Sequence, residues 1–90
     1  MYKIIPTTQF KKDLKLIKKQ GKDVTELNKV INSLAAGKTL PEKYRDHLLS
    51  GNWRNHRECH IAPDWLLIYK IDNNVLVLTL ARTGSHSDLF

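Results

Sequence analysis

Hydrophobic residues recur at helical spacing in two successive segments of the first 37 residues. The first segment runs from about Gln9 to Gln20, can be capped by Thr7 or Thr8, and is stopped by Gly21. Its apolar residues lie four and three positions apart and so share one helix face: Phe10, Leu14 and Ile17. This spacing predicts an amphipathic helix.

The second segment begins at Asp23 and ends near Ala36. Asp23 and Glu26 have the spacing of a capping box, which favours a helix start. The apolar face again follows helical spacing: Val24, Leu27, Val30, Ile31 and Leu34. Because only Gly21-Lys22 separates the two predicted helices, we expect a short helical hairpin.

The second half of the chain changes to the period of two that is typical of strands. The predicted strands, with an earlier one near the N-terminus, are residues 2–5, 53–61, 65–71 and 75–82, and residues 39–52 form a loop. Turn sequences at 62–64 and 72–74 join the last three strands into an antiparallel meander. Two helices packed on one face of a mainly antiparallel sheet give an α+β fold, in one domain spanning residues 1–90. The other face of the sheet is then free to be a working surface.

Alternation along residues 53–61 divides their side chains between the two faces of the sheet. One face receives Arg54, His56, Glu58 and His60, and the other receives Trp53, Asn55, Arg57, Cys59 and Ile61. We expect Trp53 and Ile61 to face the helices, and the histidines to face solvent or a ligand. His56, Cys59 and His60 have roughly zinc-like spacing, but on a strand Cys59 points away from both histidines. We therefore predict no metal site and no cofactor.

Charge indicates the kind of partner. The chain carries 15 Lys and Arg against 9 Asp and Glu, a net charge of +6, and its pI is about 9.6. Such a basic small domain favours a polyanionic partner, most simply nucleic acid. Four lysines follow one stripe of the first predicted helix: Lys11, Lys15, Lys18 and Lys22. By default such a stripe is a solvated helix face.

Composition excludes several classes of protein. Hydrophobic residues at 41% and charged residues at 27% are ordinary globular values, so disorder is not expected. The single Cys59 cannot form an intrachain disulfide, which fits a reducing cytoplasm. The N-terminus lacks the apolar stretch of a signal peptide, and no run is long enough to span a membrane. We expect a soluble cytoplasmic protein with no membrane partner.

Three stretches, in this order, carry a family resemblance: DHLLSGNW at 46–53, RECHIAPDWLLIYKI at 57–71 and RTGSHSDLF at 82–90. Together they resemble the YafQ branch of the RelE-type toxins of bacterial type II toxin–antitoxin systems. The resemblance implies a RelE-like (microbial ribonuclease-like) fold and a ribosome-dependent endoribonuclease that enters the A site and cuts translated mRNA. It also implies neutralisation by a cognate antitoxin, with operator DNA contacted only through the antitoxin complex.

Metal-free RNA cleavage requires a base for the 2′-hydroxyl proton, an acid for the leaving 5′-oxygen, and positive charge on the phosphate. Imidazole can serve as either acid or base at cellular pH. The residue types and the family motifs together give five catalytic candidates: His47, Glu58, His60, Asp64 and His86. His56 matches no part of the family motif and is left as a surface residue.

The RNA-binding candidates are aromatic and basic: Trp65, Phe90, Arg57, Arg82, Lys11, Lys15, Lys18 and Lys22. Trp65 is also a natural core residue, and Arg82 could merely flank the last strand. At the C-terminus, Gly84 can let the chain fold back, and Ser85 with Asp88 can cap a final turn that brings His86 and Phe90 toward the RNA. The competing interpretation is a frayed tail.

Two other function classes remain open from the sequence. The histidines and aromatic residues could belong to a non-catalytic RNA-binding or ribosome-binding module. Alternatively, the chain could be a degenerate toxin that acts only with its antitoxin in regulating their own operon. Both alternatives differ from the endoribonuclease in lacking cleavage activity.

Overall fold

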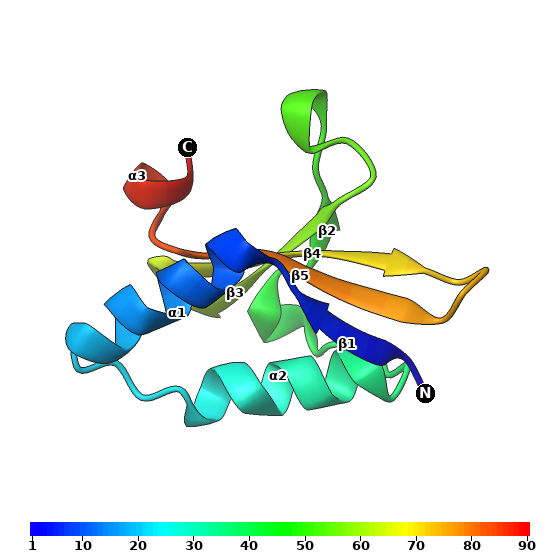
Figure 1. Ribbon diagram of the computed structural model, residues 1–90, viewed down its shortest axis with the longest axis horizontal. Coiled ribbons are helices and arrows are strands. Elements are labelled where there is room, and N and C mark those ends of the chain that lie inside the picture. Colours follow the sequence, from blue (N-terminus) through cyan, green and yellow to red (C-terminus); the bar gives the residue numbers. More distant parts are fainter.

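The computed structural model describes residues 1–90 and contains two main helices, a five-stranded sheet and a short C-terminal helix (Figure 1). The elements are β1 (Lys3–Pro6), α1 (Thr8–Lys19), α2 (Thr25–Ala35), the 3₁₀ turn η1 (Glu42–Tyr44), β2 (His47–Leu48), the 3₁₀ turn η2 (Gly51–Trp53), β3 (Arg57–Ala62), β4 (Trp65–Asp72), β5 (Val77–Gly84) and α3 (His86–Leu89). No helix is both long and apolar enough to cross a membrane.

The sheet has the strand order β1-β5-β4-β3-β2. β1 runs parallel to β5, and every other neighbouring pair is antiparallel. The meander of β3, β4 and β5 is the one expected from the alternating pattern, and the predicted α+β fold is confirmed. The loop predicted at residues 39–52 is wrong in part, because it contains η1, η2 and the two-residue strand β2.

The ends of the two helices are held in different ways. Thr7 caps α1 as predicted, because its Oγ1 accepts a hydrogen bond from the Phe10 amide at 3.0 Å. The capping box predicted for α2 is wrong. Asp23 accepts from the Thr25 amide at 2.9 Å, and the Glu26 carboxylate accepts from the Tyr44 hydroxyl instead. Glu26 therefore ties α2 to η1.

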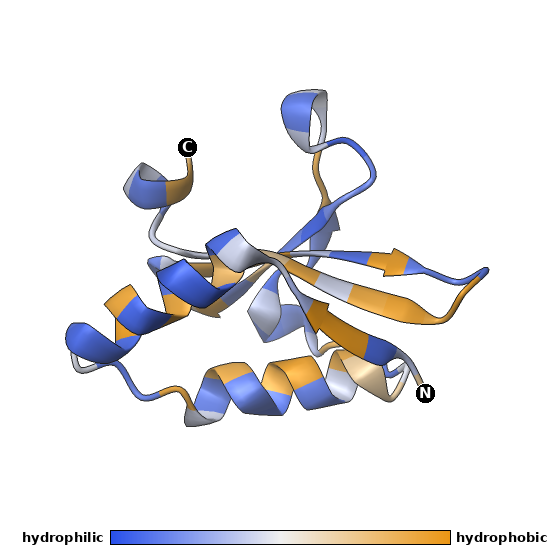
Figure 2. Ribbon diagram, viewed as in Figure 1, coloured by the Kyte–Doolittle hydropathy of each residue, from blue (hydrophilic) through white to orange (hydrophobic).

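The main core lies between the sheet and the two long helices (Figures 1 and 2). The hydrophobic stripe of α2 is turned toward the sheet in Figure 2. The largest fully buried side chains include Tyr69, Leu27, Leu67, Leu78 and Val30. Close packing of these side chains fixes the helices on one face of the sheet.

A second, smaller cluster occupies the opposite face of the sheet. It contains Leu66, Ile68, Ala81 and Leu89, with the partly buried Leu49 and Trp53 packed against it. Leu89 belongs to α3, and Leu49 and Trp53 belong to the segment around η2. These contacts hold α3 and the η2 segment above this face, where Figure 1 shows both rising on the same side.

The prediction for Trp53 is wrong. β3 begins at Arg57, and Trp53 lies in η2, where it packs on the smaller cluster instead of facing the helices. The physical reason is Asn55, whose φ of 69° interrupts the extended backbone. His56 therefore lies outside β3, and strand alternation does not place it with His60. From Arg57 onward the alternation holds, and Ile61 is buried in the main core as expected.

Candidate active site

Three histidines from three different elements lie in a row on the face of the sheet opposite to α1 and α2. His47 is in β2, His60 is in β3 and His86 begins α3. The ring centroids of His47 and His60 are 6.4 Å apart, and those of His60 and His86 are 6.2 Å apart. Phe90 continues the row, with its centroid 5.7 Å from that of His86. The predicted histidines are thus brought together from positions 39 residues apart in the chain.

Glu58 lies beneath two of these histidines. Its Oε1 atom is 3.4 Å from Nε2 of His47 and 3.7 Å from Nε2 of His60, and its side chain is only 4% exposed. In the register of the sheet, Glu58 is opposite His47 on β2, and it shares a face with His60 two residues along β3. Because both Nε2 atoms lie within 3.7 Å of this buried carboxylate, Glu58 helps to orient both rings.

The α3 turn is docked and is not a frayed tail. Ser85 caps it by accepting from the Asp88 amide at 3.2 Å, and Leu89 is buried in the smaller cluster. α3 packs directly over Gly84, since a Cβ at this position would be in van der Waals contact with Leu89 Cδ2, 3.4 Å away. These contacts position His86 beside His60.

Asp64 and Trp65, adjacent in sequence, have different surroundings. Asp64 is exposed, and its Oδ1 accepts from the backbone amide of His86 at 3.4 Å, so that it links the β3–β4 turn to the start of α3. Trp65 is 5% exposed, and its Nε1 donates to Thr83 Oγ1 at 2.9 Å. These contacts favour the core interpretation of Trp65 over a ring that stacks on RNA.

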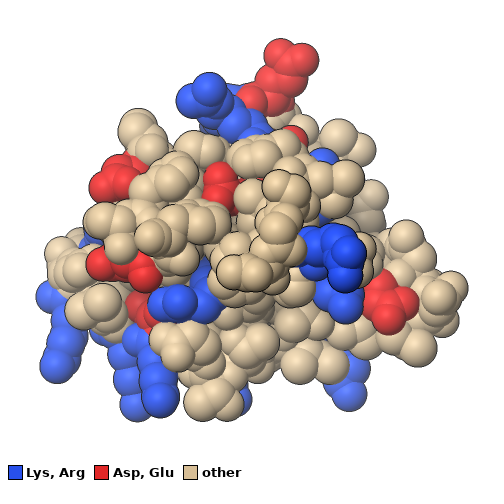
Figure 3. Space-filling model, turned by 90° about the horizontal axis from the view of Figure 1, so that it is seen from above, with Lys and Arg blue, Asp and Glu red and all other residues tan.

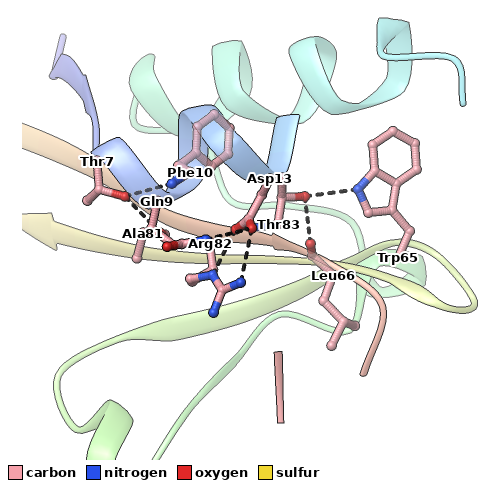
Figure 4. A network of polar contacts seen from close by, with 9 residues as sticks. All are labelled: Thr7, Gln9, Phe10, Asp13, Trp65, Leu66, Ala81, Arg82 and Thr83. Carbon is pink, nitrogen blue, oxygen red and sulfur yellow. Dashed lines mark hydrogen bonds and ion pairs between the residues drawn. The ribbon is translucent and has the colours of Figure 1, made fainter. Parts of the chain in front are cut away.

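Arg82 is fixed by a residue that we did not single out from the sequence. Its Nε donates to Asp13 Oδ2 at 2.8 Å, and one of its amino groups donates to Asp13 Oδ1 at 3.0 Å (Figure 4). Asp13 also accepts from the Thr83 amide. Burial acts to raise the pKa of Asp13, but the hydrogen bonds from Arg82, Thr83 and Gln9 outweigh it and hold the pKa below its usual value.

The signal that could have identified Asp13 is its position in α1. It lies three residues after Phe10 and four before Ile17, on the face that packs against the sheet. An acidic residue on the apolar face of a helix requires a buried partner.

Arg57 lies on the side of the sheet opposite to the histidines. Its Nη2 is 3.1 Å from Asp46 Oδ2, and the Tyr69 hydroxyl donates to Asp46 Oδ1 at 2.5 Å. The hydrogen bond with Asp46 raises the pKa of Arg57. This cluster of Arg57, Asp46 and Tyr69 is thus separated from the histidine row by the sheet itself.

The predicted lysine stripe is solvent-facing. Lys11, Lys15 and Lys18 are exposed on α1, and Lys22 is half-buried with its Nζ 5.7 Å from the centroid of the Trp65 ring. Figure 3 views the molecule from the side of the histidines and shows Lys and Arg side chains projecting from its rim.

Cys59 and His60 point to opposite faces of β3, as expected from the alternation. Cys59 is fully buried in the main core, and burial raises the pKa of its thiol to about 12. No group of three or more His, Cys, Asp and Glu side chains is arranged so that it could hold a metal ion.

Comparison with known proteins agrees with this geometry. The family model of the bacterial toxin of type II toxin–antitoxin systems, YafQ, matches residues 2–90. The mRNA interferase toxin YafQ of Escherichia coli K12 is 43% identical over 84 residues, which cover 91% of this chain and 88% of that protein.

Two solved structures share the fold over the whole chain. A metal-bound toxin from Helicobacter pylori is 46% identical with a TM-score of 0.94, and the match covers 100% of both chains. The E. coli DinJ–YafQ complex contains a chain that is 38% identical with a TM-score of 0.92, covering 100% of this chain and 99% of that one. The family resemblance expected from the three motifs is confirmed: the chain belongs to the YafQ family of toxins of bacterial type II toxin–antitoxin systems.

Proposed function

We propose that this toxin is a ribosome-dependent endoribonuclease that cleaves mRNA by metal-free acid–base catalysis. The observation that carries the proposal is the row of His47, His60 and His86, two of which share the buried carboxylate of Glu58. The E. coli relative is named an mRNA interferase toxin, which supports the same activity.

The proposed reaction needs two proton transfers at one phosphate. A base removes the 2′-hydroxyl proton, and the 2′-oxygen attacks the adjacent phosphorus. The bond from phosphorus to the 5′-oxygen then breaks as an acid protonates that oxygen, which leaves a 2′,3′-cyclic phosphate and a free 5′-hydroxyl. Centroid separations of 6.4 and 6.2 Å let either neighbouring pair of histidines flank a phosphate. A well-placed acid or base typically contributes about 10²–10⁴ in rate.

Arg82 is well held for a role beside the phosphate. Asp13 engages its Nε and one amino group and thereby fixes the plane of the guanidinium, whose side chain is 24% exposed. A fixed guanidinium stabilises developing negative charge without reorganising during the reaction. Asp13 is in this scheme a positioning residue, since it acts through Arg82.

Phe90 is placed to hold a base of the mRNA. Its ring is 59% exposed at the end of the histidine row, beside His86. Stacking on an exposed aromatic ring tolerates any base and is worth about 1–3 kcal/mol by alanine substitution in single-strand binders. Phe90 would therefore position the nucleotide next to the cleaved bond.

The partners that we propose follow from the charge and from the family. The exposed Lys11, Lys15 and Lys18, with Lys22, would contact phosphates of ribosomal RNA. Since the E. coli relative forms a complex with DinJ, we propose a cognate antitoxin for this chain, through whose complex alone operator DNA is contacted. The toxin would act in the bacterial cytoplasm, where translated mRNA is found.

The test is single-turnover cleavage of mRNA on programmed ribosomes. Replacing His47, His60 or His86 with alanine should each lower the rate by about 10²-fold or more while ribosome binding is retained. His56→Ala is the matched control, because His56 lies outside the row, and it should cut at the wild-type rate. If purified wild-type toxin binds ribosomes but leaves the mRNA intact, the chain is a non-catalytic binding module or a degenerate toxin.

A further inference from the structure

The backbone just before His47 has an unusual conformation. Arg45 follows η1 with φ 52° and ψ 41°, in the left-handed region of backbone conformation that residues other than glycine rarely adopt. Its carbonyl oxygen lies 2.7 Å from Nδ1 of His47. Strained conformations of this kind persist only where surrounding contacts hold them.

The contact with the Arg45 carbonyl determines which nitrogen of His47 carries a proton. A carbonyl oxygen only accepts hydrogen bonds, so Nδ1 of His47 must be the donor. In the neutral ring the other nitrogen, Nε2, is then the unprotonated one. Nε2 faces the site, 3.4 Å from Glu58 Oε1, a longer contact than the 2.7 Å between Nδ1 and the Arg45 carbonyl, so the carbonyl has the stronger hold on the proton. Every proton that His47 gains or loses therefore passes through Nε2.

Asp46 anchors the same segment from the opposite side of the sheet. Its carboxylate accepts from the Tyr69 hydroxyl at 2.5 Å and from Arg57 Nε at 3.2 Å. Tyr69 is 1% exposed in the main core, where burial, with the neighbouring Asp46, raises its pKa so that the hydroxyl stays protonated and donates. Asp46 is thus tied to a buried residue of the main core.

This anchor matters because β2 itself is weakly held. It pairs with β3 over only two residues, His47 and Leu48, and the His47 side chain is 50% exposed. Adjacent residues of a strand point to opposite faces, so Asp46 can reach the core while His47 reaches the site. Without Asp46, the position of the imidazole would depend on this short pairing and on the contacts of the ring with the Arg45 carbonyl and Glu58.

We propose that Asp46 and the left-handed Arg45 are positioning residues for His47. Asp46 holds the segment 45–47 to the sheet through Tyr69 and Arg57, and the Arg45 carbonyl retains the Nδ1 proton, so that Nε2 is the reacting nitrogen. The catalytic consequence rests on the proposed function, whereas the hydrogen-bonded state of His47 does not.

The first measurement needs no substitution. Nitrogen-15 NMR of the histidine side chains distinguishes the two neutral tautomers, and it is made on the wild-type protein at a pH where His47 is neutral. We expect His47 to carry its proton on Nδ1. A proton on Nε2 in the neutral ring would overturn the proposal, whatever the cleavage activity.

The second measurement compares variants by single-turnover cleavage and by ribosome binding. Asp46→Ala and Arg45→Val should lower the rate at saturating toxin by about 10–10²-fold, since small displacements of a reacting group have effects of that size. Binding should stay near the wild-type value. Tyr69→Phe removes only the hydrogen bond from the Tyr69 hydroxyl to Asp46 and keeps the ring, so it should lower the cleavage rate less than Asp46→Ala does. It replaces Asp46→Ala as the test if that variant does not fold.

Two further variants separate the effect of the Arg45 carbonyl from that of the Arg45 guanidinium. Arg45→Gly removes the guanidinium but favours the left-handed backbone, so it should retain much more activity than Arg45→Val. Equal losses would show that the guanidinium acts instead, and would overturn the role of the carbonyl. Leu76→Val is the matched control, because Leu76 has φ 53° at the β4–β5 turn, away from His47. It should change neither the tautomer nor the rate.

Failure of the positioning proposal for Asp46 can be told apart from failure of the proposed function. If His47→Ala cuts mRNA at the wild-type rate, the assignment of His47 in the proposed function fails, while the NMR result still decides the state of its ring. If Asp46→Ala keeps both the Nδ1 tautomer and the full rate, the positioning role of Asp46 is wrong and the proposed function stands.

Discussion

Oε1 of Glu58 lies 3.4 Å from Nε2 of His47, across the pairing of β3 with the two-residue strand β2. The carboxylate is almost completely buried, and its nearest basic groups are imidazoles that belong to the histidine row. Burying a carboxylate with so little compensation is unfavourable for the fold. Its position is explained if it serves the site.

Glu58→Gln should therefore affect activity and stability in opposite directions. The amide keeps the shape but removes the charge that orients His47 and His60, so the single-turnover rate should fall by about 10-fold or more. The free energy of unfolding should stay the same or rise, because a neutral amide costs less to bury than a carboxylate. Denaturant titration measures the free energy of unfolding, and mRNA cleavage on programmed ribosomes measures the rate, both on the same preparation. A variant that is less stable and fully active would contradict a catalytic role for Glu58.

The ion pair of Asp13 and Arg82 should make stability depend on pH in the acid range. The folded state lowers the pKa of Asp13, so its contribution is fully present above the unfolded value of about 3.9 and is lost as the pH falls through the folded value.

Asp13→Ala should lower the free energy of unfolding by about 1–3 kcal/mol at pH 7, because it leaves the Thr83 amide and Arg82 without their acceptor. The difference in unfolding free energy between wild type and variant should shrink below about pH 4. Urea titrations from pH 2 to 7 measure it. A difference that is constant over this range would contradict the assignment to Asp13. Asp23→Ala is a comparison and not a silent control: the hydrogen bonds from Thr25 also lower the pKa of Asp23, but Asp23 is exposed, so its pH-dependent difference should be smaller.

The fold could be predicted largely from local patterns. The period of 3.6 indicated α1 and α2, the period of 2 indicated β3, and a nearly continuous apolar run with the turn at 72–74 indicated β4 and β5. β2 has only two residues and so carries no periodic signal. Alternation failed at Trp53 because Asn55 adopts a left-handed conformation, which no pattern of hydrophobic and polar residues encodes.

The sequence predicted which residues form the candidate site better than it predicted how they contact one another. Glu58 and His60 could be placed on one face from spacing alone, but the selection of His47 and His86 depended on the family motifs. The partners of Arg82 and Arg57 could not be predicted, since Asp13 is 69 residues from Arg82 and Asp46 is 11 residues from Arg57. Such pairs depend on tertiary contacts.

The lysines of α1 should determine ribosome binding rather than stability. Lys15→Glu combined with Lys18→Glu should weaken ribosome association by about 10-fold and reduce its dependence on salt, because fewer counterions are released. Exposed substitutions usually change stability by less than about 0.5 kcal/mol. Lys29→Glu with Lys38→Glu makes the same change in charge on exposed residues outside α1. Equal weakening by both pairs would show that net charge acts, and not this stripe.

Leu89→Ala should lower cleavage although Leu89 is a buried apolar residue with no acid, base or charge to offer. Leu89 is the residue of α3 that is buried in the smaller cluster, and α3 carries His86. Truncation removes apolar contacts worth about 2 kcal/mol, which exceeds what a single turn can supply by itself. The α3 turn should therefore undock while the sheet stays folded, so His86 and Phe90 lose their positions together.

Hydrogen exchange should show faster exchange at the Leu89 and Phe90 amides, with β4 unchanged, and the cleavage rate should approach that of His86→Ala. Phe90→Ala is the comparison: it keeps α3 docked and removes only the exposed ring, so its loss should be smaller. If Leu89→Ala frees α3 but cleaves mRNA at the wild-type rate, docking of the terminal turn has no part in catalysis.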